Sequence, residues 1–159
     1  MKFINKALVA AAFATAAVTA TAQEQFIPAL SYRVGPYAAG GSGFFGGVID
    51  YMNLINASGG INGVKMTYEE CETEYNATRG VECYERLKKS RGGATAVEPL
   101  STGIAYGLLD RVAQDKIPMT TLGYGRSDAA DGRVFPYVFP LITSYWSQAA
   151  GMMKYLGDK

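Results

Sequence analysis

The chain has 159 residues, of which 15 are basic and 14 acidic, and it contains no histidine. Without histidine, Ser-His-Asp triads, Cys-His pairs and metal sites built on imidazole ligands are all excluded. The balanced charge includes no basic block, so nucleic acid is not an expected partner.

The first 22 residues have the three-part pattern of a secretory signal peptide. Lys2 and Lys6 make a positive start, residues 7–18 are uncharged and rich in alanine, and Ala20-Thr21-Ala22 offers small residues to a signal peptidase. The apolar run is shorter than the ~20 residues of a membrane span. No cysteine follows the cleavage point to carry a lipid. We expect residues 1–22 to be removed on export and the mature protein to be periplasmic.

Strand-like and helix-like segments alternate along the remaining sequence. Phe44, Phe45, Val48, Met52 and Ile55 recur at helical spacing after Ser42, which can cap a helix. We expect strands at 26–32, 64–70, 94–97, 117–121 and 137–139, and helices at 42–57, 76–89, 102–115 and from Ser144 onward. Repeated β-α units of this length predict an α/β fold with a doubly wound parallel sheet, covered by helices on both faces.

Two patterns suggest catalysis or a cofactor only weakly. Residues 41–46 match the Gly-x-Gly-x-x-Gly dinucleotide fingerprint, but the first glycine lies too far beyond the expected strand to form its tight turn. Four glutamates between residues 69 and 74 could in principle act in acid-base or Ca²⁺ chemistry, although a solvated turn explains them more simply. We therefore expect no catalytic residues, no metal and no cofactor.

Cys71 and Cys83 are the two cysteines of the sequence. In an oxidising compartment they can form a disulfide that closes a short loop. The alternative is a pair of buried thiols. We favour the disulfide because the chain carries an export signal and has no third cysteine to compete.

A binding site is expected where the parallel strands end, because ligands of open α/β sheets bind outside the carboxyl ends of the strands. Ser101 and Thr102 can offer hydroxyls and free backbone N–H groups at a helix start, which suits a carboxylate. The candidate residues are Tyr37, Ser101, Thr102, Gly103, Gly123, Tyr124 and Gly125. Simpler roles stay open: a helix cap for Ser101 or Thr102, turns for the glycines and a core position for Tyr124.

The phrases INASGGINGVKM and YEECETEYN, at residues 55–66 and 68–76, resemble the Leu/Ile/Val-binding-protein group. These are type I periplasmic substrate-binding proteins of ABC importers, and the resemblance covers nearly all of the mature chain. It implies two Rossmann-like lobes that trap a solute between them. Residues 23–138 would form the first lobe. Residues 139–159 would form the crossover at the hinge and the first helix of a second lobe whose remainder is missing.

The resemblance also implies a function and partners. The partners would be a small solute, such as an amino acid, amide or carboxylate, and an ABC permease in the inner membrane. Ser101, Thr102, Tyr124 and Gly125 match positions where the family holds the carboxylate and ammonium groups of an amino acid. Tyr124 and Gly125 differ from the small residue and hydroxyl often found there. The alternative functions are a ligand-sensing receptor ectodomain, since receptors use the same lobes, and an exported enzyme that uses carboxylates.

Overall fold

A computed structural model describes residues 24–121 and 125–158. The predicted signal peptide, Gly123 and Tyr124 lie outside the described residues. Two pairs of parallel strands form the sheet: β1 (Gln25–Ser31) with β2 (Met66–Glu72), and β3 (Met119–Thr121) with β4 (Val138–Pro140). The strands are short and rich in apolar or β-branched residues. They overlap the segments that the sequence predicts, with ends that differ by one or two residues.

The segment 94–97 joins the two strand pairs into one parallel arrangement. Ala94 bridges to Phe26 in β1, and Val97 bridges to Met119 in β3. The resulting order is β2, β1, 94–97, β3, β4. The prediction of a regular strand at 94–97 is wrong, because only these isolated bridges form. Gly93, at φ +110°, precedes the segment and Pro99 follows two residues after it, so little extended chain can pair.

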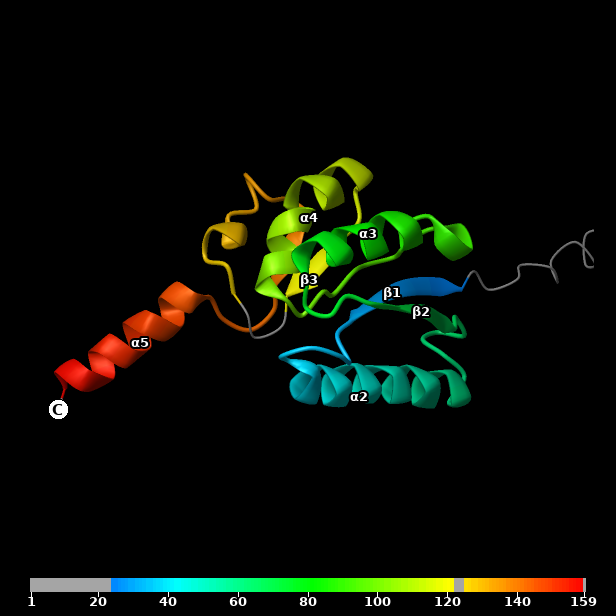
Figure 1. Cartoon of the computed structure of the whole chain (residues 1–159), viewed down its shortest axis with the longest axis horizontal. Coiled ribbons are helices and arrows are strands. Elements are labelled where there is room, and N and C mark those ends of the chain that lie inside the picture. Colours follow the sequence, from blue (N-terminus) through cyan, green and yellow to red (C-terminus); the bar gives the residue numbers. More distant parts are fainter. Residues whose placement is uncertain (1–23, 122–124, 159) are drawn as a thin grey trace, which may run out of the picture.

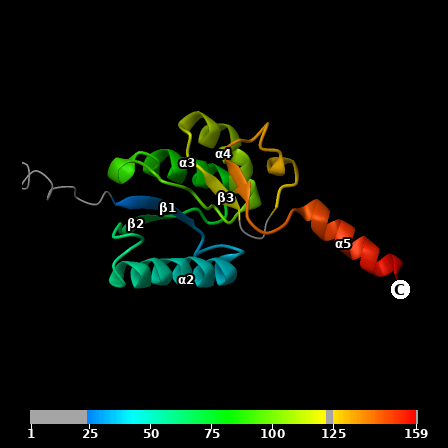
Figure 2. The ribbon, with the colours of Figure 1, turned by 180° about the vertical axis from the view of Figure 1, so that it is seen from behind.

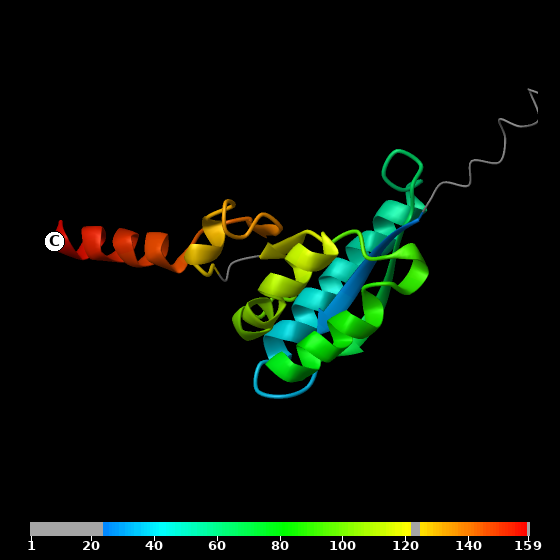
Figure 3. The same cartoon turned by 90° about the horizontal axis from the view of Figure 1, so that it is seen from above.

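Helices cover both faces of the sheet (Figures 1 and 2). Helix α2 (Ala38–Ala57) lies on one face, and α3 (Ala77–Leu87) and α4 (Thr102–Asp115) lie together on the other. Short 3₁₀ turns occupy Ser90–Gly92 (η1) and Asp128–Ala130 (η2). Helix α5 (Tyr145–Gly157) extends away from this body, as Figure 3 also shows. This α/β arrangement confirms the predicted fold class.

Helix α2 starts four residues before the predicted cap. Tyr37 is its N-cap residue and makes no side-chain cap bond, so the prediction that Ser42 caps the helix is wrong. Gly35, at φ +91°, and Pro36 turn the chain directly into the helix. All three glycines of the fingerprint-like motif therefore lie inside a helix, where they cannot form a phosphate-binding turn. A side chain at Gly41 would collide with the backbone of Tyr32.

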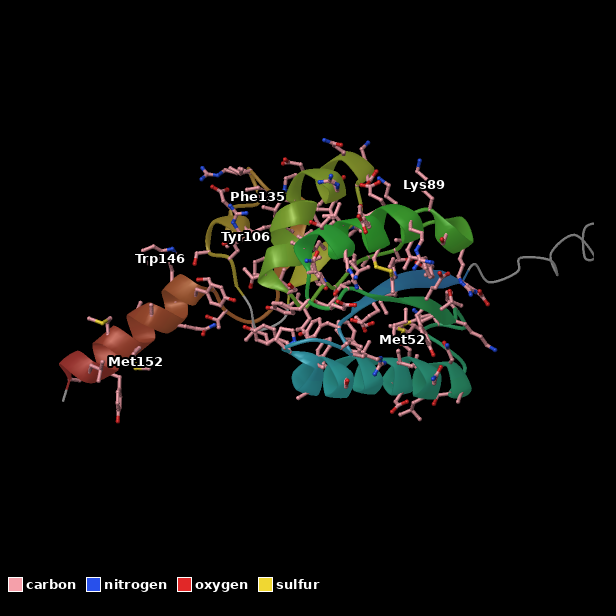
Figure 4. All side chains as sticks on the ribbon, in the orientation of Figure 1. Met52, Lys89, Tyr106, Phe135, Trp146 and Met152 are labelled. Carbon is pink, nitrogen blue, oxygen red and sulfur yellow. A yellow bond between two sulfur atoms is a disulfide. The ribbon has the colours of Figure 1, made fainter. Side chains whose placement is uncertain are left out.

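The main core lies between the sheet and the α3–α4 pair. Leu30, Val97 and Met119 from the extended segments meet Tyr84 and Leu108 from the helices, all fully buried. Each such side chain stabilises the fold by roughly 2 kcal/mol relative to exposure. On the other face, Met52 points from α2 towards the sheet and is also buried (Figure 4).

A polar cluster ties the end of α3 to the end of α4. The carboxylate of Asp115 accepts hydrogen bonds from the Tyr84 hydroxyl at 2.9 Å and the Lys88 ammonium at 2.8 Å. Burial raises the pKa of Tyr84, and the hydrogen bond to Asp115 raises it further. Partial burial favours the neutral form of Asp115, but the hydrogen bonds from Lys88 and Tyr84 outweigh it and lower the pKa. Asp115 therefore stabilises the fold as an anion.

The disulfide between Cys71 and Cys83 connects β2 to α3, with 5.8 Å between the Cα atoms. It closes a loop with a sequence separation of 12. Cys83 is buried, whereas Cys71 is partly exposed. Among the helices of the described ranges, none combines the length and the apolar character required to cross a membrane.

Replacing Asp115 by Asn should destabilise the protein in a pH-dependent way. The pKa of Asp115 is lower in the folded than in the unfolded chain. Its contribution is therefore complete above the unfolded value of about 3.9 and is lost as the pH falls through the lower folded value. Urea unfolding of both proteins between neutral and acid pH measures this. The stability gap should close below about pH 4, and a gap unchanged by pH would contradict the assignment. Asp110→Asn, at an exposed position of α4, is the matched control.

The double substitution Cys71→Ala and Cys83→Ala should lower the free energy of unfolding by roughly 3 kcal/mol, because it removes a cross-link that restricts the unfolded chain. Urea unfolding of the oxidised wild type and the variant measures the difference. Wild-type protein that is unfolded without reductant should show no reactive thiol. Two reactive thiols would contradict the disulfide.

Candidate functional site

The carboxyl ends of the parallel strands meet at one edge of the sheet. The chain runs from β1 outward to β2, then crosses β1 to enter the segment 94–97 on the other side. The strand order therefore reverses between β1 and this segment, and a ligand crevice forms at such a reversal. The residues that follow these strands are Tyr32 after β1, Thr73 to Tyr75 after β2, and Glu98 to Ser101 after the third segment.

Ser101 and Thr102 begin α4 at this edge. Ser101 is buried and is the N-cap residue, and its Oγ accepts a hydrogen bond from the Ile104 N–H at 3.3 Å. The structure therefore confirms that Ser101 caps α4, which the sequence had left open as an alternative role. In an α-helix the first N–H groups have no partner within the helix, so those of Thr102 and Gly103 point outward from the N-terminus. The Thr102 hydroxyl lies 2.8 Å from the Tyr145 hydroxyl at the start of α5.

Glu98 braces the loop that leads to Ser101. Its Oε1 accepts from the Leu100 N–H at 2.7 Å, and its Oε2 accepts from the Thr120 hydroxyl of β3 at 3.0 Å. Leu100 has φ +46°, and its carbonyl accepts from the Tyr32 hydroxyl at 3.3 Å. The loop is thus fixed to both neighbouring strands. Sequence reasoning missed Glu98 because its partners are set by the fold, although a lone acidic residue directly after an apolar segment was a usable signal.

Three tyrosines form a row beside the start of α2. The Tyr37 and Tyr75 ring centroids are 4.3 Å apart, and those of Tyr75 and Tyr32 are 4.9 Å apart. Tyr37 is 56% exposed, so its ring is available to a ligand. Tyr75 has φ +61° and is held in its turn by a bond from its N–H to the Thr73 hydroxyl. Of these three, the sequence singled out only Tyr37.

Gly125 and Gly103 differ in what surrounds them. A Cβ at Gly125 would collide with the Thr143 carbonyl, and the Gly125 carbonyl accepts from the Tyr145 N–H at 2.9 Å. Gly125 therefore makes room for the chain that leads to α5. A Cβ at Gly103 would meet only the Ala77 side chain, at an ordinary 3.9 Å. Gly123 and Tyr124, the other two candidates, lie outside the described residues.

Arg126 lies in the loop after β3, and its positive charge is over the ring of Tyr106, which is one turn along α4 from Thr102. Its guanidinium carbon lies 3.9 Å from the Tyr106 ring centroid and 5.7 Å from that of Phe135. Figure 4 shows Tyr106 and Phe135 close together beside α4. Thr102, Thr121 and Arg126 also line a small cavity of about 10 Å³. This volume holds about one water molecule, so the cavity is too small for a solute.

The described residues hold no metal-type cluster, since no group of three or more Cys, Asp and Glu side chains converges there. Three of the four glutamates between residues 69 and 74 form ion pairs with arginines. Glu70 pairs with Arg33, and Glu74 pairs with Arg79. The arrangement at the sheet edge offers backbone N–H groups, hydroxyls and aromatic rings, which are groups that bind a ligand.

Comparison with known proteins places this geometry in context. Residues 24–159 match the family model described as "Periplasmic binding protein". A solved structure from the Pseudomonas fluorescens group, described as an ABC transporter permease, is 47% identical with a TM-score of 0.77. The match covers 84% of this chain and 33% of that one. No curated protein matches the sequence.

Two more distant structures share the fold. A fatty acid ABC transporter substrate-binding protein from Thermomonospora curvata is 18% identical, with a TM-score of 0.73 over 86% of this chain and 33% of its own. A branched-chain amino acid transporter substrate-binding protein from Streptococcus pneumoniae, in complex with isoleucine, is 19% identical, with a TM-score of 0.65. The match covers 73% of this chain and 33% of that one. The chain thus spans about a third of the length of these structures.

Replacing Glu98 by Ala should loosen the loop before α4. Two hydrogen bonds would be lost, which lowers the free energy of unfolding by about 1–3 kcal/mol. Hydrogen exchange should also become faster at the Leu100 N–H. Glu98→Gln, which keeps one acceptor oxygen, should have a smaller effect. An exchange rate at Leu100 that is unchanged in Glu98→Ala would contradict the bracing role.

Proposed function

The chain belongs to the periplasmic binding protein family, and from this premise we propose that it captures a small solute for an ABC importer. The observation that carries the proposal is the N-terminus of α4, which is held by Glu98 and Tyr32 at the point where the strand order reverses. A helix N-terminus offers outward N–H groups and a partial positive charge to an anion.

The chemistry of this edge favours a solute with a carboxylate or amide oxygen. The N–H groups of Thr102 and Gly103 and the Ser101 hydroxyl would contact that oxygen, and Arg126 would add longer-range attraction. The Tyr37 ring would cover an apolar part of the solute. Two solved relatives support this class, because isoleucine and fatty acids, the compounds in their descriptions, share a carboxylate group.

We assign residues 23–138 to a first lobe and residues 139–159 to the crossover and the start of a second lobe. The hydrogen bond between Thr102 and Tyr145 and the contact of Gly125 with Thr143 would connect them. Solute bound at the first lobe would be enclosed when a second lobe rotates over it, as in hinge closure. An open edge and a mostly pre-formed first half of the site suit such a motion.

The remaining parts of the proposal concern location and partners. Removal of residues 1–22 on export would leave the protein in the periplasm, where a permease of the inner membrane would recognise the closed form. The solute would leave unchanged, because the proposed site binds without catalysis. An isolated sensing domain would bind solute in the same way, so delivery to a permease needs its own assay with reconstituted transporter.

Solute binding should depend on the hydroxyls at the start of α4. We expect Thr102→Val combined with Ser101→Gly to weaken binding of the best carboxylate solute by roughly tenfold or more, because hydrogen bonds to a charged group are lost. Glycine at position 101 keeps most of the capping effect, so the fold should survive. Calorimetric titration of the purified natural protein that carries this chain, with a panel of amino acids, amides and small carboxylates, makes the measurement.

Ser58→Ala, at the C-cap of α2, is the control. Ser58 is exposed just past the last residue of that helix, and its hydroxyl donates to the Leu54 carbonyl. This variant should bind as the wild type does. Unchanged affinity in the double variant would remove Ser101 and Thr102 from the site. If no member of the panel binds the wild type, the proposed solute class is wrong.

A further inference from the structure

The first turn of α5 is bonded to the loop that follows β3. The Tyr145 N–H donates to the Gly125 carbonyl at 2.9 Å. The Trp146 N–H donates to the Ser127 hydroxyl at 3.0 Å. The N–H groups at a helix start have no partner within the helix, so these two bonds satisfy them and hold the start of α5 on this loop.

The Tyr145 side chain extends from this turn to the first residue of α4. Its hydroxyl lies 2.8 Å from the Thr102 hydroxyl, although the two residues are 43 positions apart in the sequence. Tyr145 is 40% exposed and Thr102 is half-buried, so this pair lies at the surface of the protein. The proposed function assigns the start of α4 to the solute carboxylate. Tyr145 therefore contacts one of the groups proposed to bind that carboxylate, although it belongs to a different helix.

Either hydroxyl of this pair can donate the hydrogen bond, and their chemistry favours Tyr145 as the donor. A phenol hydroxyl is a stronger donor than an aliphatic hydroxyl, and its oxygen is a weaker acceptor because a lone pair is delocalised into the ring. When Tyr145 donates, the Thr102 oxygen accepts and the Thr102 hydrogen remains available. An ionised carboxylate has acceptors only, so it requires this hydrogen from Thr102.

We propose that Tyr145 is a positioning residue of the solute site. Its hydroxyl donates to the Thr102 oxygen and thereby directs the Thr102 hydrogen towards the solute carboxylate. The inference rests on the proposed function and adds to it a residue of α5, which acts through Thr102 rather than by touching the solute.

Two physical effects make this arrangement favourable for binding. A hydroxyl has about three staggered positions, and holding it in the productive one before the solute arrives improves affinity by roughly threefold. A hydroxyl that accepts a hydrogen bond is also polarised, which strengthens the bond that it donates. The coupling is reciprocal, so a bound carboxylate strengthens the bond between Thr102 and Tyr145 and thus the attachment of α5 to the first lobe.

Tyr145→Phe tests the inference, because it removes only the hydroxyl. We expect the natural protein with this substitution to bind the tightest carboxylate of the solute panel roughly threefold more weakly in calorimetric titration. The same substitution should not change the affinity in a Thr102→Val background, where the hydroxyl that it positions is absent, and should regain its effect in Thr102→Ser. Tyr51→Phe is the matched control, since it removes the same atom from a tyrosine of α2 that is 63% exposed. This control should bind as the wild type does.

Hydrogen exchange of the solute-free protein separates positioning from a purely structural role. The N–H groups of residues 145 and 146 should exchange equally fast in Tyr145→Phe and in the wild type, since their bonds to the loop after β3 remain. Faster exchange together with weaker binding would overturn the inference, because the hydroxyl would then only anchor α5.

The sign of the change in affinity is equally decisive. Equal binding by Tyr145→Phe would overturn the inference. Tighter binding would overturn it as well, because Thr102 would then donate to Tyr145 and the solute would have to displace that bond. A wild type that binds no member of the panel would instead contradict the proposed function, and the inference would fail with it.

Discussion

The position of β1 between two parallel neighbours is the constraint on which the rest of the structure depends. β2 pairs along one side from Gln25 to Ser31, and the Phe26 carbonyl accepts from the Thr95 N–H on the other side. Because all three segments run in the same direction, their carboxyl ends meet at one edge. The residues that leave that edge, Tyr32, Tyr75 and Ser101, are far apart in sequence and come together only through this order. A different strand order would separate these three residues even if none of them were replaced.

The second requirement is a rigid entry to α4. Glu98 fixes Leu100 to β3, and Tyr32 fixes the Leu100 carbonyl to the end of β1. The helix N-terminus therefore has a set direction before any solute arrives, which reduces the ordering that binding would cost. The link between Thr102 and Tyr145 has a further consequence. It couples this entry to α5, so a solute that bonds the Thr102 hydroxyl would act directly on the chain segment that we assign to the hinge.

Much of this fold follows from local sequence, and the exceptions have physical causes. Apolar periodicity predicted the helices, and three of them begin at cap residues, Asn76, Ser101 and Ser144, each of which bonds an N–H only a few residues away. The prediction that Ser42 caps α2 was wrong, because Gly35 and Pro36 start this helix earlier. Glu98 and Tyr75 were missed for other reasons. The contact of Glu98 with Thr120 spans 22 residues, and Tyr75 has a left-handed backbone that its side chain does not favour. The sheet edge that carries the candidate site was thus predictable from the sequence, whereas the residues that gather there were predictable only in part.

The central claim is that a carboxylate solute binds at the N-terminus of α4, and backbone amide NMR tests it most directly. The protein is labelled with ¹⁵N and titrated with the tightest-binding carboxylate from a solute screen. The account predicts the largest shifts at the N–H groups of Thr102 and Gly103, since these would donate to the carboxylate, with smaller shifts near Tyr37. Saturable shifts centred elsewhere, for example around the disulfide between β2 and α3, with Thr102 and Gly103 unmoved, would contradict it.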